Sequence, residues 1–352
     1  MIHISGESKL KAAILEKLNS PLVVDSIEPQ RLQYGQVLVE VHKSGICGAQ
    51  IGEIAGVRGP DRFLPHLMGH EGGGIVLEIG PGVKYVKPGD HVVMHWRKGV
   101  GIEADPPKYQ RGDSLIGGGW VTTFNEMAVV SENRLTPIAE DIPFEIAALM
   151  GCAVTTGLGI INNEAHLKIG QSIAVIGCGG IGLNVIQGAA MVSANPIIAI
   201  DINNLKLQMA WEFGCTHTVN LTQEDISEKI EEIIGKNGSD VFVDTTGRPD
   251  LIAKAYRLTA PKGITIMVGQ PHHSQYLIIP SIVNDFKGKM LMDSQGGLTN
   301  PTIDIPRYIN LYRQKRLKLD NLITHRYPLG KINEAIKTIK DGKAGRVILE
   351  LK

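Results

Sequence analysis

One stretch, residues 172–201, limits the possible fold more than any other part of the chain. It reads SIAVIGCGGIGLNVIQGAAMVSANPIIAID: an apolar strand, a glycine-rich turn, a helical segment and a second apolar strand. A GxGxxG turn in this context predicts a dinucleotide-binding unit. Gly177 turns the chain, Gly179 with the adjacent Gly180 lets the backbone approach a pyrophosphate, and Gly182 lets the helix pack closely on the sheet. The phosphates would then meet the free N–H groups of the helix N-terminus.

The second strand ends in a carboxylate, which indicates the kind of nucleotide. Asp201 lies 24 residues after Gly177. At that place a carboxylate accepts hydrogen bonds from the adenosine ribose hydroxyls and repels a 2′-phosphate. The sequence therefore predicts NAD(H) rather than NADP(H). The alternative is a glycine turn in an α/β protein that binds no cofactor.

Composition and charge narrow the class of protein. A chain of 352 residues is longer than one hydrophobic core usually organises, which predicts two domains. Its 36 basic and 36 acidic residues balance, so no net field attracts nucleic acid or an anionic membrane. We find no signal-like apolar run near the N-terminus and no span of about 18 apolar residues. The four cysteines are scattered, which favours reduced thiols over a disulfide framework. Together, these features favour a cytoplasmic enzyme with a small-molecule substrate.

The pattern of apolar residues changes near residue 141. Before it, short apolar runs such as QVLVEVHKSG and GGIVLEIGPG alternate with Gly, Pro and charge, which is typical of strands and tight turns. After it, strands and helical stretches alternate, which predicts a parallel, doubly wound sheet. The fold class is therefore α/β, with a Rossmann nucleotide domain at 154–295. Residues 1–153 and 296–352 would form one β-rich domain split by that insertion.

Three residues before the nucleotide unit are candidate metal ligands: Cys47 in SGICGAQ, His70 in MGHEGGG and Cys152 in MGCAVTTG. Two thiolates and one imidazole leave a fourth zinc position open, which is the composition of a catalytic site. Their wide spacing differs from the close CxxC pairs of structural zinc. Two packed thiols and a core histidine are the alternative reading.

The order GICG, GHEGGG, PGDHV, GCAVTTG, GCGGIG, AIDIN resembles the zinc-dependent medium-chain alcohol dehydrogenases over essentially the whole chain. The run DIPRYINLYRQKRLKLDNLITHRYPLGKINEAI is similar to the class I and class III branch. The resemblance implies a GroES-like N-terminal barrel, and catalytic zinc on Cys47, His70 and Cys152 with Glu71 as an occasional alternative ligand. It further implies contacts with the cofactor. Thr156 and Ile181 would pack against the nicotinamide, and Lys206 would lie near the ribose. Arg346 would contact the pyrophosphate, and the backbone near Val268 would meet the carboxamide.

The implied activity is hydride transfer between NAD(H) and an alcohol or carbonyl carbon whose oxygen is bound to zinc, which acts as a Lewis acid. Substrates would include polyols and sugar derivatives as well as simple alcohols. Two other readings remain. One is an NAD-bound enzyme that oxidises its substrate transiently during elimination or epimerisation. The other is a zinc- and NAD-binding protein without catalytic activity.

The chain departs from the family pattern beside the first cysteine. A proton-relaying Ser or Thr is replaced by Ala49, a histidine-orienting Asp by Gln50, and a further relay histidine of class I enzymes by Gly52. Gln50 would accept a hydrogen bond from His70 through its amide oxygen, without a carboxylate's charge. The proton would leave through Glu71, Glu53, His95 or a substrate hydroxyl. For His95, packing in a barrel strand is the alternative. Trp96 either lines the substrate pocket or packs in the barrel.

Residues 97–120 contain no cysteine, although relatives carry four here for a structural zinc. We therefore expect one zinc per subunit and a long polar loop. Its basic residues would bind an anionic substrate group or be solvated; they are Arg97, Lys98, Lys108 and Arg111. The segment 268–292 resembles the region that pairs nucleotide domains, which favours a homodimer over a tetramer. Three further sites attract only structural readings: Cys178 and Cys215 as packing thiols, and His272–His273 as a polar turn.

Overall fold

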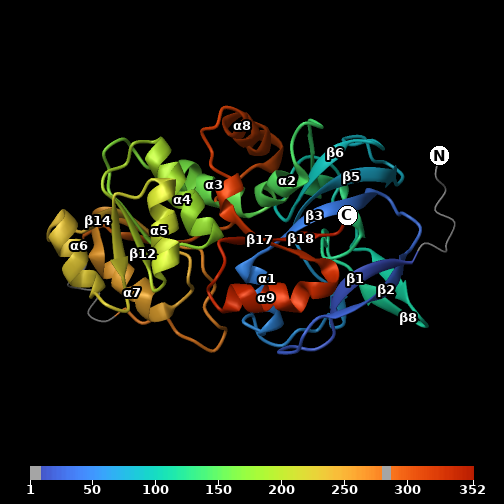
Figure 1. The fold of residues 1–352 in the computed structure, drawn as a ribbon, viewed down its shortest axis with the longest axis horizontal. Helices are drawn as coiled ribbons and strands as arrows, with labels where there is room; N and C mark the ends of the chain where they lie inside the picture. The colour runs from blue at the N-terminus through green and yellow to red at the C-terminus, as the bar shows by residue number, and fades with distance from the viewer. Residues whose placement is uncertain (1–8, 280–286) are drawn as a thin grey trace. The chain divides into compact units, whose positions relative to one another are not determined.

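The computed structural model describes residues 9–279 and 287–352, which form two compact units. One unit contains the chain up to Gly56, Pro60–Cys152 and Asn300–Lys352, and the other contains Val57–Gly59 and Ala153–Thr299. The first unit carries β-rich segments from both ends of the sequence (Figure 1).

The first unit is built on a barrel and a large sheet. The closed barrel has the strand order β1 (Leu10–Leu15), β2 (Val23–Pro29), β7 (Lys108–Arg111), β8 (Ser114–Gly117) and β4 (His66–Leu67). The sheet has the order β10 (Leu135–Ile138), β6 (His91–His95), β5 (Glu71–Ile79), β3 (Gln36–Ile46), β18 (Arg346–Glu350) and β17 (Ile323–Pro328), with β9 (Met127–Ser131) also paired to β3. Their alternating apolar residues face common cores. This confirms the predicted β-rich, GroES-like unit.

Short helices complete this unit. They are α1 (Gly48–Ile54), α2 (Phe144–Met150), α8 (Pro301–Arg313) and α9 (Ile332–Lys340), with single 3-10 turns at Glu132–Arg134, Asp320–Leu322 and Leu329–Lys331. The last strand, β18, runs antiparallel to β3, with Val347 opposite Ile46. Residues some 300 positions apart in sequence are therefore neighbours in the sheet (Figure 1).

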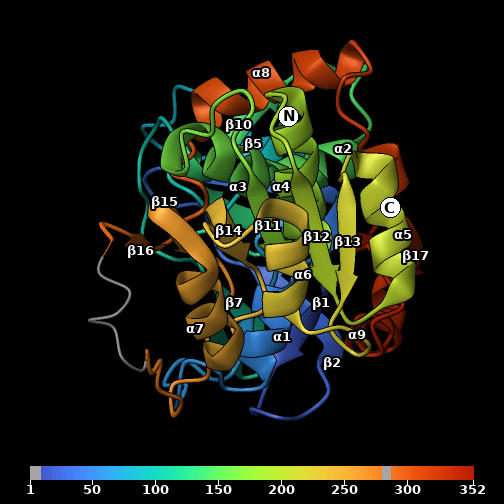
Figure 2. The ribbon, with the colours of Figure 1, turned by 90° about the vertical axis from the view of Figure 1, so that its left-hand side faces the viewer.

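The second unit is a six-stranded parallel sheet. Its order is β13 (His217–Asn220), β12 (Ile197–Asp201), β11 (Ile173–Ile176), β14 (Ser239–Asp244), β15 (Thr259–Met267) and β16 (Met290–Asp293), and Figure 2 shows the middle strands side by side. The chain starts at the centre, builds outward to β13 and returns to the other side of β11. Such a reversal is the switch point of a dinucleotide-binding fold. It confirms the predicted doubly wound sheet.

Helices cover both faces of this sheet. The helices of this unit are α3 (Ala153–Gly159), which continues into a π-helical turn at Ile160–Glu164, α4 (Gly180–Met191), α5 (Asn204–Phe213), α6 (Ile226–Ile234) and α7 (Pro249–Leu258). Ile226 and Ile230 of α6 and Leu251 and Ala255 of α7 share one core with the sheet. Helix α4 packs from the other side, on β11 and β12.

The segment 97–120 is not the unstructured loop that the sequence predicted. Its middle forms the β7–β8 hairpin, which pairs with β2 and closes the barrel. Tyr109 is fully buried there, and its hydroxyl oxygen accepts a hydrogen bond from the Val129 backbone N–H at 2.8 Å. The alternation of residues in KYQR and SLIG carried this signal, but the flanking glycines and charges obscured it.

The basic residues of this segment have protein partners. Arg111 pairs with Asp25 and Glu16, each at 2.7 Å, and Lys98 pairs with Glu103. The Arg97 guanidinium lies 5.7 Å from the centre of the Trp96 ring. The buried carboxylate of Glu132 holds the loop before the hairpin, because it accepts a hydrogen bond from the Ile102 N–H. It also accepts from the N–H groups of Lys84 and Tyr85 in another segment. Strand pairing in the β7–β8 hairpin and the hydrogen bonds of Glu132 therefore hold this segment in place.

No single helix among the described residues is long and apolar enough to cross a membrane. One bent pair, Phe144–Met150 with Ala153–Glu164, has the length and composition to do so.

Candidate active site

The first unit brings the three predicted metal ligands together from three junctions between elements. Cys47 lies between β3 and α1 and caps the helix, His70 directly precedes β5, and Cys152 follows α2. Strands β3 and β5 are paired, which places the first two residues at the same end of the sheet. The ligand atoms of all three residues lie within 4.8 Å of one another, and the two sulfur atoms are 4.0 Å apart.

Burial makes this cluster electrostatically unusual. Cys47 and Cys152 are each only 5% exposed. The hydrogen bond from the Cys152 thiol, with help from His70, holds the pKa of Cys47 well below its usual range, while the same bond and burial raise the pKa of Cys152. Burial opposes a charge on His70, but the neighbouring Cys47 and Glu71 groups together outweigh it and raise the histidine's pKa. The cluster thus favours a thiolate beside a group that carries positive charge.

Several buried polar atoms at and beside the cluster lack a hydrogen-bond partner among the described residues. They include Nε2 of His70, Oε2 of Glu71 and Nε of Arg346. Buried polar atoms are normally satisfied, so each indicates a missing partner. Two sulfurs and one imidazole nitrogen at this separation fit the tetrahedral coordination of Zn²⁺ with one position open. The residues present therefore fit a zinc ion.

Gln50 touches this cluster in an orientation that corrects the expectation from sequence. Its Oε1 accepts a hydrogen bond from the Cys47 backbone N–H at 3.0 Å, while its Nε2 contacts Nδ1 of His70. The sequence had predicted that the amide oxygen would face the histidine. The physical reason for the difference is that Gln50 is the third residue of α1, where a side-chain oxygen caps the residue that precedes the helix.

Glu71 and Arg346 form a buried ion pair beside the cluster that sequence reasoning missed. Glu71 is 0% exposed, and Nη2 of Arg346 donates to its Oε1. Burial raises the pKa of Glu71 although the guanidinium opposes this, and the Glu71 and Cys47 charges raise the pKa of Arg346 against its own burial. A Cβ added at Gly45 would lie 2.7 Å from the Glu71 carboxylate, so glycine is needed there. The predicted contact of Arg346 with pyrophosphate stays a prediction.

The candidate proton routes differ in how the structure uses them. His95 is 1% exposed; its Nδ1 donates to the Arg97 carbonyl at 2.7 Å, so its Nε2, 2.9 Å from the Thr136 hydroxyl, accepts from it. Burial lowers the pKa of His95 to about 4. This is the packed, neutral histidine of the alternative reading. Glu53 lies 3.9 Å from Nε2 of His66, and Ala49 is exposed.

Trp96 lies beside the metal cluster. Its ring centre is 6.5 Å from that of His70, and its flank packs on the core of the first unit. The indole Nε1 is buried and has no hydrogen-bond partner among the described residues. An indole N–H is only a donor, so it requires an acceptor from elsewhere.

In the second unit, the glycine turn has the geometry that the sequence predicted. Gly177 has φ 91°, and a Cβ there would lie 2.3 Å from the Thr245 hydroxyl. A Cβ at Gly182 would lie 1.9 Å from the Gly177 carbonyl oxygen, which shows how closely α4 approaches the turn. A Cβ at Gly179 would meet nothing within 4 Å. Open space therefore lies over the residue that caps α4, where an anion would approach.

Asp201 ends β12 at the same edge of the sheet. Its Oδ2 accepts from the Cys178 N–H at 2.7 Å, and its Oδ1 accepts from the N–H groups of Ile202 and Asn203. The carboxylate thus ties the glycine turn to the neighbouring strand, a role that sequence reasoning missed. A carboxylate has about four acceptor positions, so one remains for a ribose hydroxyl.

The other predicted cofactor contacts occupy defined places in the same unit. Thr156 is buried in α3, Ile181 and Lys206 lie in the first turns of α4 and α5, and Val268 directly follows β15. The Val268 N–H donates to the Asp244 carbonyl, so a carboxamide would meet its carbonyl instead. The roles of these residues in binding nicotinamide and ribose stay predictions.

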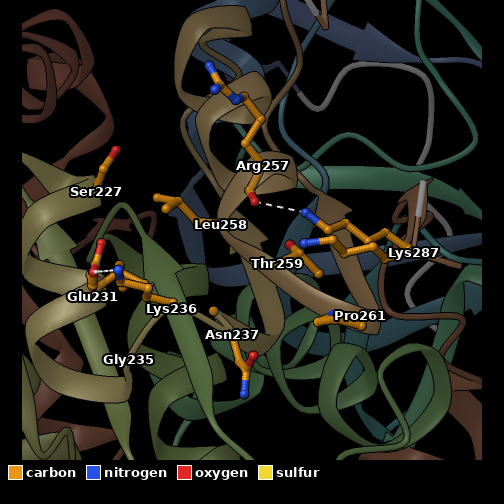
Figure 3. Close-up of a pocket in the computed structure, with 13 residues that line it drawn as sticks. Ser227, Glu231, Gly235, Lys236, Asn237, Arg257, Leu258, Thr259, Pro261 and Lys287 are labelled. Carbon is orange, nitrogen blue, oxygen red and sulfur yellow. Dashed lines mark hydrogen bonds and ion pairs between the residues drawn. The ribbon is translucent and has the colours of Figure 1, made fainter. Parts of the chain in front are cut away.

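A cavity of about 150 Å³ lies elsewhere in the second unit, and Figure 3 shows the residues that line it. Its lining includes Gly238 and Thr259, which flank the amino ends of β14 and β15, whereas the glycine turn lies at carboxyl ends. Lys236 there pairs with Glu231 at 3.8 Å. The cavity is therefore separate from the nucleotide motif. Cys178 and Cys215 are buried thiols, and the tilted rings of His272 and His273 have their centres 4.5 Å apart.

Comparisons with known proteins agree with this geometry. The family model for the alcohol dehydrogenase GroES-like domain matches residues 33–140, and that for zinc-binding dehydrogenases matches 180–312. An NDMA-dependent alcohol dehydrogenase of Amycolatopsis methanolica is 30% identical, covering 97% of this chain and 98% of the relative. An S-(hydroxymethyl)glutathione dehydrogenase of Haemophilus influenzae is 30% identical over 99% of this chain and 98% of the relative.

A solved structure shares this fold. The alcohol dehydrogenase zinc-binding domain protein of Burkholderia ambifaria superposes with a TM-score of 0.89 at 25% identity, covering 98% of this chain and 99% of the other. The chain belongs to the zinc-dependent medium-chain alcohol dehydrogenases. It is an oxidoreductase that uses zinc and a nicotinamide nucleotide to interconvert an alcohol and a carbonyl compound.

Proposed function

We propose that this protein transfers a hydride between NAD(H) and an alcohol that carries a second hydroxyl group, or its carbonyl product. The reaction would use one zinc ion on Cys47, His70 and Cys152. The observation that carries the proposal is the buried cluster of two sulfurs and an imidazole within 4.8 Å. When bound, zinc supplies Lewis acidity at the substrate oxygen. Glu71, whose Oε1 is held by Arg346, stays a predicted alternative ligand beside these three residues.

Other groups of the chain would offset the charge of the metal ion and bind the cofactor. The two thiols provide negative charge that offsets the metal ion, which suits a neutral alcohol. Gly179 and the amino end of α4 would hold the pyrophosphate, and Asp201 would accept from the ribose. The Asp201 carboxylate favours NAD over NADP because a 2′-phosphate would meet its negative charge.

Two features support a substrate with a second oxygen near the reacting one. Ala49 cannot relay a proton, so a neighbouring substrate hydroxyl would provide the first step outward. The buried indole N–H of Trp96, beside His70, would donate to that oxygen. Vicinal diols and other polyols carry this group, and simple monohydric alcohols do not.

The test compares matched substrates. The purified protein is assayed for zinc content and for NADH formation at 340 nm with vicinal diols and with monohydric alcohols of the same carbon skeleton. We expect one zinc per chain and a kcat/KM for diols about 10-fold or more above that for the monohydric partners. Replacing Cys47→Ser should lower turnover by about 100-fold or more, because a thiolate ligand is lost. NADH formation that is unaffected by Cys47→Ser would refute the zinc assignment. Product formation without net NADH would favour an epimerase or eliminase.

The assembly that we propose is a homodimer formed through the nucleotide units. Strand β16 lies at the edge of the six-stranded sheet, and exposed edges can pair across a twofold axis. Residues 280–286 of the segment predicted to form this interface lie outside the described residues.

A further inference from the structure

Gln50 lies between two groups of the metal site. Its side chain is 2% exposed and occupies the first turn of α1. The amide oxygen accepts from the Cys47 backbone N–H at 3.0 Å, and the amide nitrogen contacts Nδ1 of His70. The Gln50 carboxamide therefore contacts the backbone of one candidate ligand, Cys47, and the ring of a second, His70.

Hydrogen-bond accounting shows that this carboxamide is a poor partner for the metal-bound state. The buried and unpartnered Nε2 of His70 is the atom left to bind a metal. An imidazole that binds through Nε2 carries its proton on Nδ1, and this proton needs an acceptor. Two N–H groups, from Cys47 and His70, then face a side chain with a single acceptor oxygen and a donor NH₂ group.

We propose that Gln50 is a positioning residue that weakens zinc binding and couples it to the first turn of α1. In one orientation of the amide, the His70 Nδ1–H meets the NH₂ group. In the other, the Cys47 N–H does. Either orientation leaves one buried donor without its bond, which carries a desolvation cost. The Gln50 amide therefore opposes metal binding. An oxygen atom in place of its nitrogen would give each of the two donors an acceptor.

A glutamate at this position provides that atom. It has the same length and shape as glutamine and offers two oxygens, one for each N–H. We expect Gln50→Glu to bind zinc about 10- to 100-fold more tightly than the unaltered protein, the range typical for groups that orient a metal-binding histidine. The measurement is a competition titration of metal-free protein with zinc and a chromogenic chelator. It does not depend on turnover.

A matched variant separates the hydrogen bonds from the added charge. Gly48→Glu places the same charge two residues earlier in the same turn, where a Cβ meets nothing within 4 Å. We expect it to change zinc affinity by less than about 3-fold, since it adds no acceptor for His70. Equal tightening in both variants, or none in Gln50→Glu, would overturn the inference.

A second measurement uses the unaltered protein and so does not depend on the folding of a variant. Nitrogen-15 NMR with and without zinc reports the proton shifts of the Cys47 amide and the His70 ring N–H. With zinc bound, one of the two should lie at the shift of a proton without a hydrogen bond, whereas two hydrogen-bonded protons would refute the inference. The inference rests on the proposed zinc site: an unaltered protein that binds no zinc would refute that site itself, whereas zinc binding unaltered by Gln50→Glu refutes only the role of Gln50.

Discussion

At the scale of single residues, the candidate metal cluster shows how neighbouring groups set the charge and the position of the functional side chains. The pKa of Cys47 is low because of the Cys152 thiol and His70, and Glu71 keeps its place because Arg346 binds it. Asp201 uses backbone N–H groups from two segments to hold the nucleotide turn. Each of these side chains therefore depends on groups from other parts of the chain.

His95 gives a pH dependence of stability with a definite sign. Its pKa is about 4 in the folded protein, below the ordinary value of 6.5, because burial excludes the charge. Below pH 6.5 the unfolded chain binds a proton that the folded protein does not, so stability falls as the pH drops toward 4. The full loss is about 3 kcal/mol at about 1.4 kcal/mol per pKa unit. His95→Gln should remove this part of the decline.

The measurement is urea unfolding of both proteins at pH 7.5, 5.5 and 4.5. The variant is expected to be less stable at pH 7.5, because it disturbs the bonds to Arg97 and Thr136, and to lose less stability on acidification. Parallel pH profiles for the two proteins would contradict this assignment.

The sequence predicted the residues of the site better than their partners. Cys47, His70 and Cys152 were predicted from residue type and from the family resemblance, and the structure brings them together. Gly177 and Gly182 were predicted because close backbone contacts require glycine. The Gln50 amide was assigned the wrong orientation, since helix capping competes with the histidine for its oxygen. The Glu71–Arg346 pair was not predicted because strand pairing between β3 and β18 joins distant parts of the sequence.

At the scale of elements, the β7–β8 hairpin is the feature that the sequence did not predict. Relatives that carry cysteines in this region can tie it with a metal. Here the described residues tie it by strand pairing, by the buried Tyr109 ring and by the carboxylate of Glu132. Such packing is a tertiary effect, and local residue patterns do not reveal it.

Tyr109→Phe tests how much this hairpin contributes. The change leaves the ring in place but removes the acceptor of the buried Val129 N–H, so we expect a loss of about 1–3 kcal/mol in unfolding free energy. Leu115→Ala, on the same hairpin at a position that is 50% exposed, should cost less than about 0.5 kcal/mol. Urea unfolding measures both. Equal effects would show that the hydroxyl has no special part in the barrel.

At the scale of the whole molecule, the two kinds of chemistry belong to different units. The three candidate metal ligands lie in the first unit, and the glycine turn with Asp201 lies in the second. The candidate metal ligands and the nucleotide-binding motif therefore lie in separately organised parts of one chain, each with its own core.

Metal removal should therefore separate turnover from nucleotide binding. After treatment with a strong zinc chelator, we expect turnover to fall by about 100-fold or more, while the NADH dissociation constant measured by fluorescence changes by less than about 3-fold. Zinc added back should restore turnover. A chelated protein that no longer binds NADH would show that the metal maintains the second unit as well.

The pairing of Arg346 with Glu71 also has a consequence for synthesis of the protein. Arg346 follows Glu71 by 275 residues, and the strand that carries it lies between β17 and β3. Translation runs from the N-terminus, so this strand is synthesised after every other described part of the site. Cys47, His70 and Cys152 leave the ribosome long before that. The nascent chain therefore carries its thiols to the cell's metal and oxidant pools before the site around them can close.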